Sequence, residues 1–436
     1  MVEKITKKPE LLIPAGGMDT LKVAIDYGAD AVYMGGQKFG LRAKADNFSI
    51  EEMKEAVRYV HAHGKKVYVT VNIFAHNDDI EGVKEYFETI HNEGLDRGDT
   101  AIDALLISDF GIFTLAKEIL PDIDIHISTQ ANNTNYMTYN FWYKQGAKRV
   151  VAARELSLNE LKKIRDNIPE DMEIEAFMHG AMCISYSGRC LLSSYFTGRD
   201  ANKGACTHPC RWKYAVVEEK RPGEYLPVEE DERGTYIFNS KDLCMIEYIP
   251  EMIAAGIDSF KVEGRMKTAL YVAAVTRTYR KAIDDYYESE ELYRANMDYY
   301  KEEIAACTYR QFTTGFYFHK PDENTQIYDN NTYVNNYIYL GCVEEIVSNK
   351  DGLNDDRKAG GEVKLVMIHQ KNKFSVGEKV SVMSFDGSNI DVIVEGIYDE
   401  KMNPMESAPH PKQLLYIKFN DLNGIKPGMI IRVKRF

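Results

Sequence analysis

The chain has 436 residues, enough for two or three domains or for one large barrel with a smaller module attached. Its formal net charge of −13 argues against non-specific nucleic-acid binding by the whole surface. Because no run of 18 apolar residues and no signal-peptide pattern occurs, we expect a cytoplasmic protein without membrane contact.

Short apolar runs alternate with amphipathic helical stretches over the first part of the chain. This alternation predicts a parallel sheet with right-handed crossovers, and eight candidate strands predict a (β/α)₈ TIM barrel. An open doubly wound sheet is the alternative, although no GxGxxG motif follows the first run. The candidate strands are ELLIPAG, AVYMGG, KVYVTVNI, ALLIS, IHIST, RVVAAREL, IEAFMHG and DSFKVEG.

A long insertion at about 181–256 separates the seventh and eighth candidate strands. It holds five of the seven cysteines, and its middle part has the pattern of a β-excursion with a Pro-Gly turn. Cations outnumber anions between Gly180 and Lys213. Such a patch indicates either a site for a phosphate or carboxylate ligand or a surface that balances nearby acidic helices.

The C-terminal part of the chain changes character. Tyrosine-rich amphipathic helices are expected at about 266–306, and an Asn-rich stretch follows them. Short strands separated by Gly-containing turns then predict a small all-β barrel. We therefore expect a catalytic body over residues 1–334 and a second domain over residues 335–436.

The carboxyl ends of barrel strands normally carry the catalytic groups. Glu175 and His179 lie on one face of the seventh strand, because alternate residues of a strand share a face. For Glu175 and Glu155 a structural ion pair is the alternative to a catalytic role, since a buried carboxylate needs a partner. The polar residues at or near these ends are Asn72, Gln130, Glu155, Glu175, His179, Glu263 and Arg265.

The cysteine spacing bears on the kind of metal that the insertion could bind. Successive intervals are 7, 16, 4 and 34 residues, whereas structural zinc usually has two close pairs. Scattered thiolates favour an iron–sulfur cluster held by a folded loop, with zinc or unliganded core thiols as alternatives. The five candidates, one more than a cluster needs, are Cys183, Cys190, Cys206, Cys210 and Cys244.

Motifs of known hydrolases are missing from the sequence. It contains no HExxH, no GxSxG and no P-loop. A nucleophile and base formed by Cys183 and His179 stays open as an alternative.

The segment EAFMHGAMCISYSGRCLLSSYF resembles the signature of the collagenase-like peptidases of unknown catalytic type. Stretches such as ELLIPAGGMDTLKVAIDYGADAVYMGG, STQANNTN, NSKDLC and KVEGRMK extend the resemblance over nearly the whole chain. The family name implies a protease. Other members, however, imply oxygen-independent hydroxylation of tRNA, ribosomal RNA or the ubiquinone ring with a [4Fe-4S] cluster. The tRNA enzymes among them use prephenate as hydroxyl donor and make 5-hydroxyuridine at the wobble position.

The resemblance implies the metal ligands, and positions at strand ends or in the cysteine loop suggest the other roles. The four cluster ligands fall on Cys183, Cys190, Cys206 and Cys244, which leaves Cys210 over. Either His179 or Glu155 would move protons, and arginines would pair with the anionic prephenate. The residues expected to contact substrates are Arg42, Asn72, Gln130, Arg189, Glu263 and Arg265.

The expected partner is a tRNA anticodon loop, whose bases leave their stack more easily than those of a duplex. An oligomer with a second copy or with a related chain is also compatible with the resemblance. Two other functions stay open: a peptidase, metal-dependent or not, and a non-enzymatic RNA-binding factor with a structural zinc ion.

Overall fold

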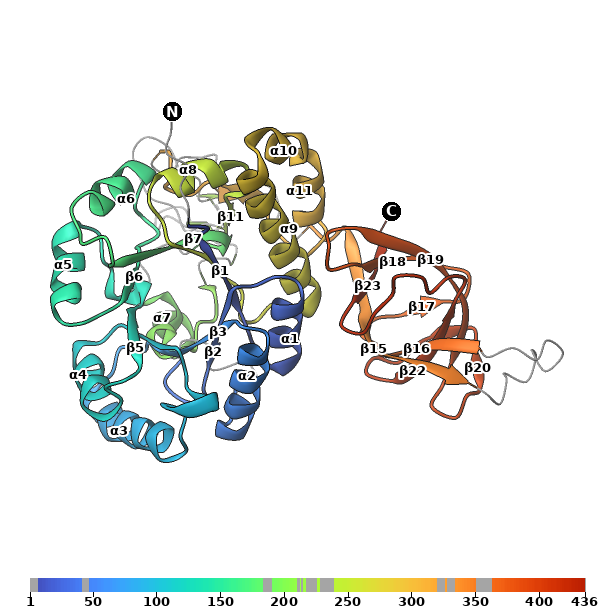
Figure 1. The fold of residues 1–436 in the computed structure, drawn as a ribbon, viewed down its shortest axis with the longest axis horizontal. Coiled ribbons are helices and arrows are strands. Elements are labelled where there is room, and N and C mark those ends of the chain that lie inside the picture. The colour runs from blue at the N-terminus through green and yellow to red at the C-terminus, as the bar shows by residue number, and fades with distance from the viewer. Residues whose placement is uncertain are drawn as a thin grey trace.

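The structure is a computed structural model. It describes residues 7–40, 47–182, 190–209, 212, 215–216, 226–227, 239–319, 326–327, 334–349 and 363–435. Its larger part is a closed barrel of eight parallel strands, seen end-on in Figure 1. The last of these strands pairs with both the seventh and the first, which confirms the predicted barrel and excludes the open sheet. The strands are β1 (Glu10–Pro14), β2 (Ala31–Gly35), β3 (Lys66–Val71), β4 (Ala104–Ile107), β5 (Asp124–Ile127), β6 (Arg149–Val151), β7 (Glu173–Ala181) and β12 (Ser259–Val262).

The barrel strands are apolar along most of their length because the barrel interior and the surrounding helices cover both of their faces. β2, β4 and β6 are buried at every position. Their side chains belong to one continuous core that also includes the inner faces of the helices.

Polar caps begin the barrel helices just after the strands end. Ser49 and Ser157 each form a capping box with the glutamate three residues further on, and Asp109 and Asn135 also cap helices. These caps fix the loops that line the mouth of the barrel. The helices are α1 (Met18–Asp26), α2 (Ile50–Ala62), α3 (Asn77–Asn92), α4 (Phe110–Ile119), α5 (Tyr136–Lys144), α6 (Leu158–Arg165), α8 (Ile249–Ala254) and the predicted tyrosine-rich α9 (Ala269–Glu288), α10 (Glu290–Ala295) and α11 (Met297–Ile304).

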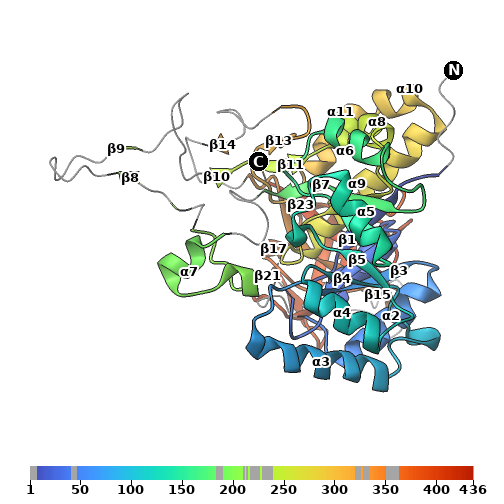
Figure 2. The same ribbon diagram turned by 90° about the vertical axis from the view of Figure 1, so that its left-hand side faces the viewer.

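The insertion after β7 lies at the carboxyl end of the barrel. Its described parts include α7 (Leu192–Thr197) and the 3₁₀ turn η3 (Ala201–Lys203). Figure 1 shows α7 inside the outline of the ring, and Figure 2 shows it beyond one end of the barrel. The two views together place α7 over the mouth.

The insertion returns to the barrel through β11 (Asp242–Cys244), which pairs antiparallel with the end of β7. β7 is therefore longer than the other barrel strands, and its end is shared between the barrel and the insertion. The remaining short elements before the C-terminal domain, inside and outside the insertion, are η1 (Gly98–Thr100), η2 (Thr129–Ala131), η5 (Ile246–Tyr248), β8 (Ala215–Val216), β9 (Leu226–Pro227), β10 (Asn239–Ser240), β13 (Phe312–Thr313) and β14 (Gln326–Ile327).

The C-terminal part is an antiparallel sheet with a hydrophobic core of its own. The strand Lys379–Met383 pairs with Ile430–Lys434 on one side and with Asn389–Tyr398 on the other, and this second pairing closes the sheet into the expected small barrel. Figure 1 shows it beside α1 and α9. Its strands are β15 (Tyr337–Asn349), β16 (Val363–His369), β17 (Phe374–Ser375), β18 (Lys379–Met383), β19 (Asn389–Tyr398), β20 (Pro404–Met405), β21 (Ser407–Ala408), β22 (Leu414–Phe419) and β23 (Ile430–Lys434).

A buried ionic cluster joins the two barrels. Glu303 of α11 accepts hydrogen bonds from Arg277 of α9 at 2.5 Å and from Arg432 of β23 at 2.8 Å. Asn389 of β19 donates to the same carboxylate at 2.9 Å. Burial alone would raise the pKa of Glu303, but the two arginines outweigh it and hold the pKa below its ordinary value. The carboxylate is therefore ionised and bridges the domains.

Within the described ranges, no helix combines the length and apolar character needed to cross a bilayer.

Candidate active site

Amide and hydroxyl side chains surround the mouth on the β3 to β5 side. Asn72 follows β3 and donates from Nδ2 to Oγ of Ser128, at 3.3 Å, beyond the end of β5. Ser108, which follows β4, donates to the backbone oxygen of Asn72 at 2.9 Å. Gln130 is the middle residue of η2, the turn that Ser128 caps. Loops from three neighbouring strands thus bring these side chains to one side of the mouth.

Two amide atoms of this group are buried without a hydrogen-bond partner among the described residues. They are Oδ1 of Asn72 and Oε1 of Gln130. Turning either amide over exchanges its oxygen and nitrogen, so one polar atom is left unpaired in both orientations. An unpaired buried polar atom destabilises a protein by about 1–3 kcal/mol. Atoms kept in this condition at a barrel mouth are typical of a site that binds a polar ligand.

Arg265 lies beyond the carboxyl end of β12 and is buried near the mouth. It donates to Oγ1 of Thr70 on β3 at 3.2 Å. A Cβ added at Gly35, the last residue of β2, would lie 1.9 Å from Nη1 of Arg265. Gly35 therefore leaves room for the guanidinium to pass directly over its backbone, and a larger residue would require Arg265 to shift.

A second arginine lies on the β6 side of the mouth. Arg154 donates to Glu263 at 3.2 Å, and its guanidinium lies 3.8 Å from the ring centre of Phe177. Glu155 follows it and is half-buried. Burial raises the pKa of Glu155, although its own backbone and Arg154 act in the opposite direction. This carboxyl group holds a proton at higher pH than an ordinary glutamate does.

His179 links the barrel to the cysteine insertion. Its backbone pairs with that of Cys244 across β7 and β11. Nδ1 of His179 lies 3.3 Å from the hydroxyl of Tyr279 on α9, and Sγ of Cys244 lies 3.6 Å from the same hydroxyl. Burial lowers the pKa of His179 to about 4, so the imidazole is neutral near pH 7. Burial likewise raises the pKa of the Cys244 thiol to about 11.

Cys206 is held by α7 and by its own loop. Oγ of the buried Ser193 donates to Sγ of Cys206 at 3.7 Å, and the backbone N–H of His208 donates at 3.4 Å. Nδ1 of His208 lies 4.0 Å from the same sulfur. Burial alone would raise the pKa of this thiol, but the contacts with His208 and Ser193 lower it to about 6. Cys206 is therefore mainly a thiolate at neutral pH.

The donor chemistry of these cysteines fits a soft metal centre, because thiolates bind iron–sulfur clusters and zinc. The positions of Cys190, Cys206 and Cys244 do not by themselves form a site. Within the described part of the chain no three Cys, His, Asp or Glu side chains gather closely enough to hold a metal ion. Cys183 and Cys210 lie outside the described residues. The set of four cysteine ligands thus stays a prediction.

Glu175 does not lie at the mouth. Its carboxylate accepts from Lys261 at 2.7 Å and from Arg149 at 3.1 Å, and Arg149 also pairs with Glu10 at 2.6 Å. Glu10 and Arg149 are the first residues of β1 and β6, so this cluster fills the amino end of the barrel. The contacts of Glu175 support the structural alternative that its sequence left open.

The remaining predicted site residues, Arg42 and Arg189, lie outside the described residues. Sequence reasoning also missed several residues of the mouth. Arg154 precedes Glu155 directly and could have been found at the same strand end. Ser128 and Thr70 have no sequence signal beyond being polar near a strand end, and Tyr279 comes from a helix far along the chain.

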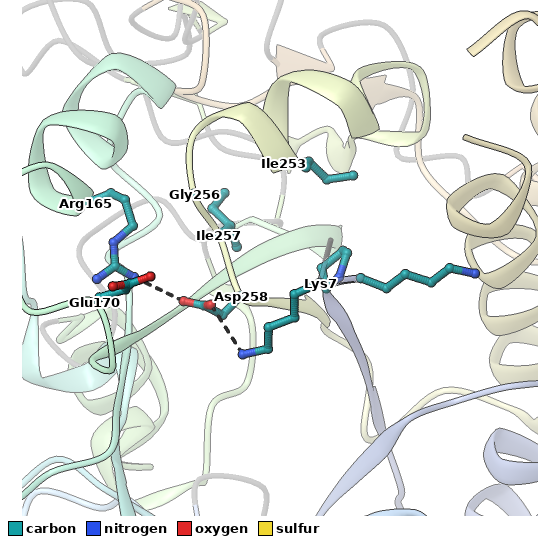
Figure 3. Close-up of a pocket in the computed structure, with 9 residues that line it drawn as sticks. Lys7, Arg165, Glu170, Ile253, Gly256, Ile257 and Asp258 are labelled. Carbon is teal, nitrogen blue, oxygen red and sulfur yellow. Dashed lines mark hydrogen bonds and ion pairs between the residues drawn. The ribbon is translucent and has the colours of Figure 1, made fainter. Parts of the chain in front are cut away.

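A cavity of about 230 Å³ lies at the mouth, between the loops after β2 and β3 and the cysteine insertion. Gly36, Gln37, Asn47 and Ile73 line it, together with the ion pair of Asp79 and Lys203. A second cavity of about 190 Å³ lies at the opposite end of the barrel, and Figure 3 shows that Asp258 there pairs with Lys7 and Arg165. The first cavity is the one that can serve the candidate site.

Comparison with known proteins gives two family matches. Residues 16–327 match the model of peptidase family U32, and residues 352–432 match the U32 C-terminal domain. The chain is 38% identical to tRNA hydroxylation protein P1 of Bacillus subtilis over 98% of this chain and 95% of that protein. It is 36% identical to tRNA hydroxylation protein P of Escherichia coli, with 92% of each covered. An uncharacterized protease of Methanocaldococcus jannaschii is 44% identical over 72% of this chain and 74% of that protein.

Proposed function

The chain belongs to peptidase family U32, and from its similarity to relatives named for tRNA hydroxylation we propose that it is a tRNA hydroxylase. The product would be 5-hydroxyuridine at the wobble position, with prephenate as the hydroxyl donor. The observation that carries the reaction class is the similarity over 98% of the chain to a relative named for tRNA hydroxylation. In the overall reaction a C–H bond of the base becomes C–OH. The base loses two electrons, and the donor exchanges its hydroxyl group for hydrogen and accepts them.

The side chains at the mouth support a base as ligand. The edge of uracil offers an N–H donor between two carbonyl acceptors, and Asn72 and Gln130 each keep one amide atom for such a partner. Prephenate carries two carboxylates, which guanidinium groups bind well. Arg265 and Arg154 are the arginines described at the mouth, and Arg42 and Arg189 stay predicted contacts.

Two groups are candidates for proton transfer. Glu155 is half-buried beside the mouth, and burial raises its pKa, so it holds a proton more readily than an ordinary glutamate and is a candidate general acid or base. His179 is neutral and is held by Tyr279, so it would accept a hydrogen bond rather than act as a cation. Glu263 is paired with Arg154, which suits it to positioning that arginine.

We propose that Cys183, Cys190, Cys206 and Cys244 would hold a [4Fe-4S] cluster. Such a cluster supplies one-electron transfer or an iron site for an oxygen ligand. The thiolate character of Cys206 and the position of Cys244 beside His179 support this set. Binding of the other cysteines would place the cluster on the insertion that lies over the mouth.

A peptidase is the second candidate function, and one observation favours it. The thiolate of Cys206 lies 4.0 Å from the ring of His208, a pairing that also activates nucleophilic cysteines. Neither HExxH nor GxSxG accompanies it in the sequence. We therefore rank hydroxylation first, and identification of the reaction product distinguishes the two functions.

The test begins with protein purified without oxygen. We expect about four iron and four sulfide per chain, and a visible absorbance that bleaches on reduction. Incubation with unmodified tRNA and prephenate should yield 5-hydroxyuridine by mass spectrometry of digested nucleosides. Cys206→Ala should lose both iron and product, whereas Cys342→Ala, a change of a cysteine in the C-terminal barrel, should keep them.

Other outcomes would contradict the proposal. Cleavage of gelatin by the wild type, lost in Cys206→Ala and without any change in tRNA, would indicate a peptidase. A colourless protein with one zinc ion, no iron and unchanged tRNA would indicate an RNA-binding factor with a structural metal.

A further inference from the structure

The described part of the insertion carries exposed aromatic side chains beside the mouth. Tyr195 is 83% exposed, Trp212 is 44% exposed and Phe196 is 43% exposed. The rings of Phe196 lie 5.1 Å from Tyr195 and 6.0 Å from Trp212, measured between ring centres. Leu191, 69% exposed, is the N-cap residue of α7 and precedes Tyr195 by one helical turn. We call this surface, formed by Leu191, Tyr195, Phe196 and Trp212, the aromatic ledge.

Polar contacts on the other face of α7 hold the ledge in place. Ser193 is fully buried, and its Oγ accepts from the backbone N–H of Thr207 at 3.0 Å while donating to Cys206. Lys203 of η3 donates to Asp79 at the start of α3 at 2.8 Å. The inner face of this segment thus faces the protein, and the aromatic rings face outward. Burial therefore does not explain why these rings are large and apolar.

The position of the ledge relates it to the mouth. α7 lies over the barrel end, as Figures 1 and 2 show together. Lys203, which follows α7 closely, lines the mouth cavity together with the loops after β2 and β3. The insertion therefore borders the cavity that a ligand at the mouth would occupy.

We propose that the aromatic ledge stacks unpaired bases of the RNA loop that flank the base inserted into the mouth. This inference rests on the proposed function and names how the same site recognises its substrate. Aromatic side chains stack on bases of any sequence because each base has a π-face. An exposed cation, Arg199, follows α7 directly beyond its end. The ledge therefore combines stacking surfaces with a nearby cation that can attract a phosphate.

The test measures binding and turnover with the full chain, purified without oxygen, and an anticodon stem-loop RNA. Tyr195→Ala should weaken binding and raise the KM for RNA about tenfold, with kcat nearly unchanged. Tyr195→Phe keeps a ring and should restore the wild-type KM. A role in folding alone would not separate KM from kcat in this way. Phe318→Ala, a change of another exposed aromatic residue, is the matched control and should have no effect.

Tryptophan fluorescence gives a second readout. The chain has two tryptophans, and Trp142 is buried while Trp212 lies on the ledge. Stacking of a base on Trp212 should quench the emission when RNA binds. Trp212→Phe should bind RNA with similar affinity but show no quenching.

The outcomes separate the ledge from the proposed reaction. Unchanged KM and no quenching, in a wild type that modifies tRNA, would overturn the ledge and leave the reaction standing. Quenching that depends on Trp212 and binding that depends on Tyr195, without any 5-hydroxyuridine, would support the ledge and overturn the reaction. A change of oligomeric state in Tyr195→Ala, measured by light scattering, would assign the ledge to self-association and overturn its role in RNA binding.

Discussion

Two side chains at the barrel mouth have buried polar atoms that contribute nothing to the stability of the fold. Asn72 and Gln130 each keep a buried amide atom without a partner among the described residues. Such atoms lower the stability of the folded protein, so their presence at the mouth of the barrel indicates a function. The amide and hydroxyl groups at the mouth make it suitable for reading the polar edge of a base.

Gln130→Met tests this interpretation directly. The change removes an unpaired polar atom, so we expect an equal or slightly higher melting temperature. Formation of 5-hydroxyuridine should fall about tenfold or more, since a contact to the substrate is lost. Calorimetry and nucleoside mass spectrometry on the same preparation give both values. Gln145→Met changes an exposed glutamine at the end of α5 and serves as the control.

At the scale of the elements, charged side chains that pair with one another fill the amino end of the barrel. Arg149 of β6 contacts Glu10 of β1 and both Glu173 and Glu175 of β7. Burial alone would raise the pKa of Glu10, but Arg149 together with hydrogen bonds from Tyr68 and Ser259 holds the pKa below its ordinary value. The cluster ties β1, β3, β6, β7 and β12 together at the end of the barrel opposite the site.

Arg149→Met should destabilise the fold by about 3–5 kcal/mol at neutral pH, because it leaves the carboxylate of Glu10 without its cationic partner and removes one of the two cations that pair with Glu175. In the wild type the lowered pKa of Glu10 gives stability that is present above the unfolded pKa and is lost as the pH falls through the folded pKa. In Arg149→Met, burial without the guanidinium raises the pKa of Glu10. Protonation of Glu10 at low pH therefore stabilises the folded variant. The difference in unfolding free energy should therefore shrink as the pH falls below about 5.

Denaturant unfolding of both proteins between pH 4 and pH 7 measures this difference. Arg294→Met removes the exposed ion pair with Glu290 and should change stability by less than about 1 kcal/mol. A difference that stays constant with pH would show that Arg149 acts through packing rather than through its charge.

The barrel strands and helices could be predicted from sequence because each has a clear periodic pattern and polar caps. β11 could not, since a strand of three residues has no period and gains its structure by pairing with the end of β7. The position of Cys244 follows from that pairing and could not be predicted either. The ion pairs of Arg149 with Glu10 and Glu175 could not be predicted from sequence, because these residues are scattered along the chain and the closed barrel brings them together.

At the scale of the whole molecule, one carboxylate connects the catalytic barrel to the C-terminal barrel. Glu303 lies between Arg277 of the first domain and Arg432 of the second, and all three are buried. Tyr27 adds hydrogen bonds to the backbone of Met383 and Ile430. The small barrel is therefore held against α9, the helix that also supplies Tyr279 behind His179.

Glu303→Gln should weaken the contact between the domains, because two buried guanidinium groups then face each other without a countercharge. We expect a lower melting temperature and faster proteolysis between the two barrels. Glu302→Gln changes the neighbouring exposed carboxylate, which lies 3.8 Å from Lys434, and should leave both unchanged. Unaltered proteolysis of Glu303→Gln would mean that apolar packing alone holds the domains.

The reaction class is tested most directly by nucleoside mass spectrometry of tRNA from a strain that lacks this chain. We expect 5-hydroxyuridine to be lost at the wobble position, to return when the wild-type chain is supplied, and to stay absent with Cys206→Ala. Normal levels of 5-hydroxyuridine in the deletion strain, or full recovery with Cys206→Ala, would contradict the proposed function.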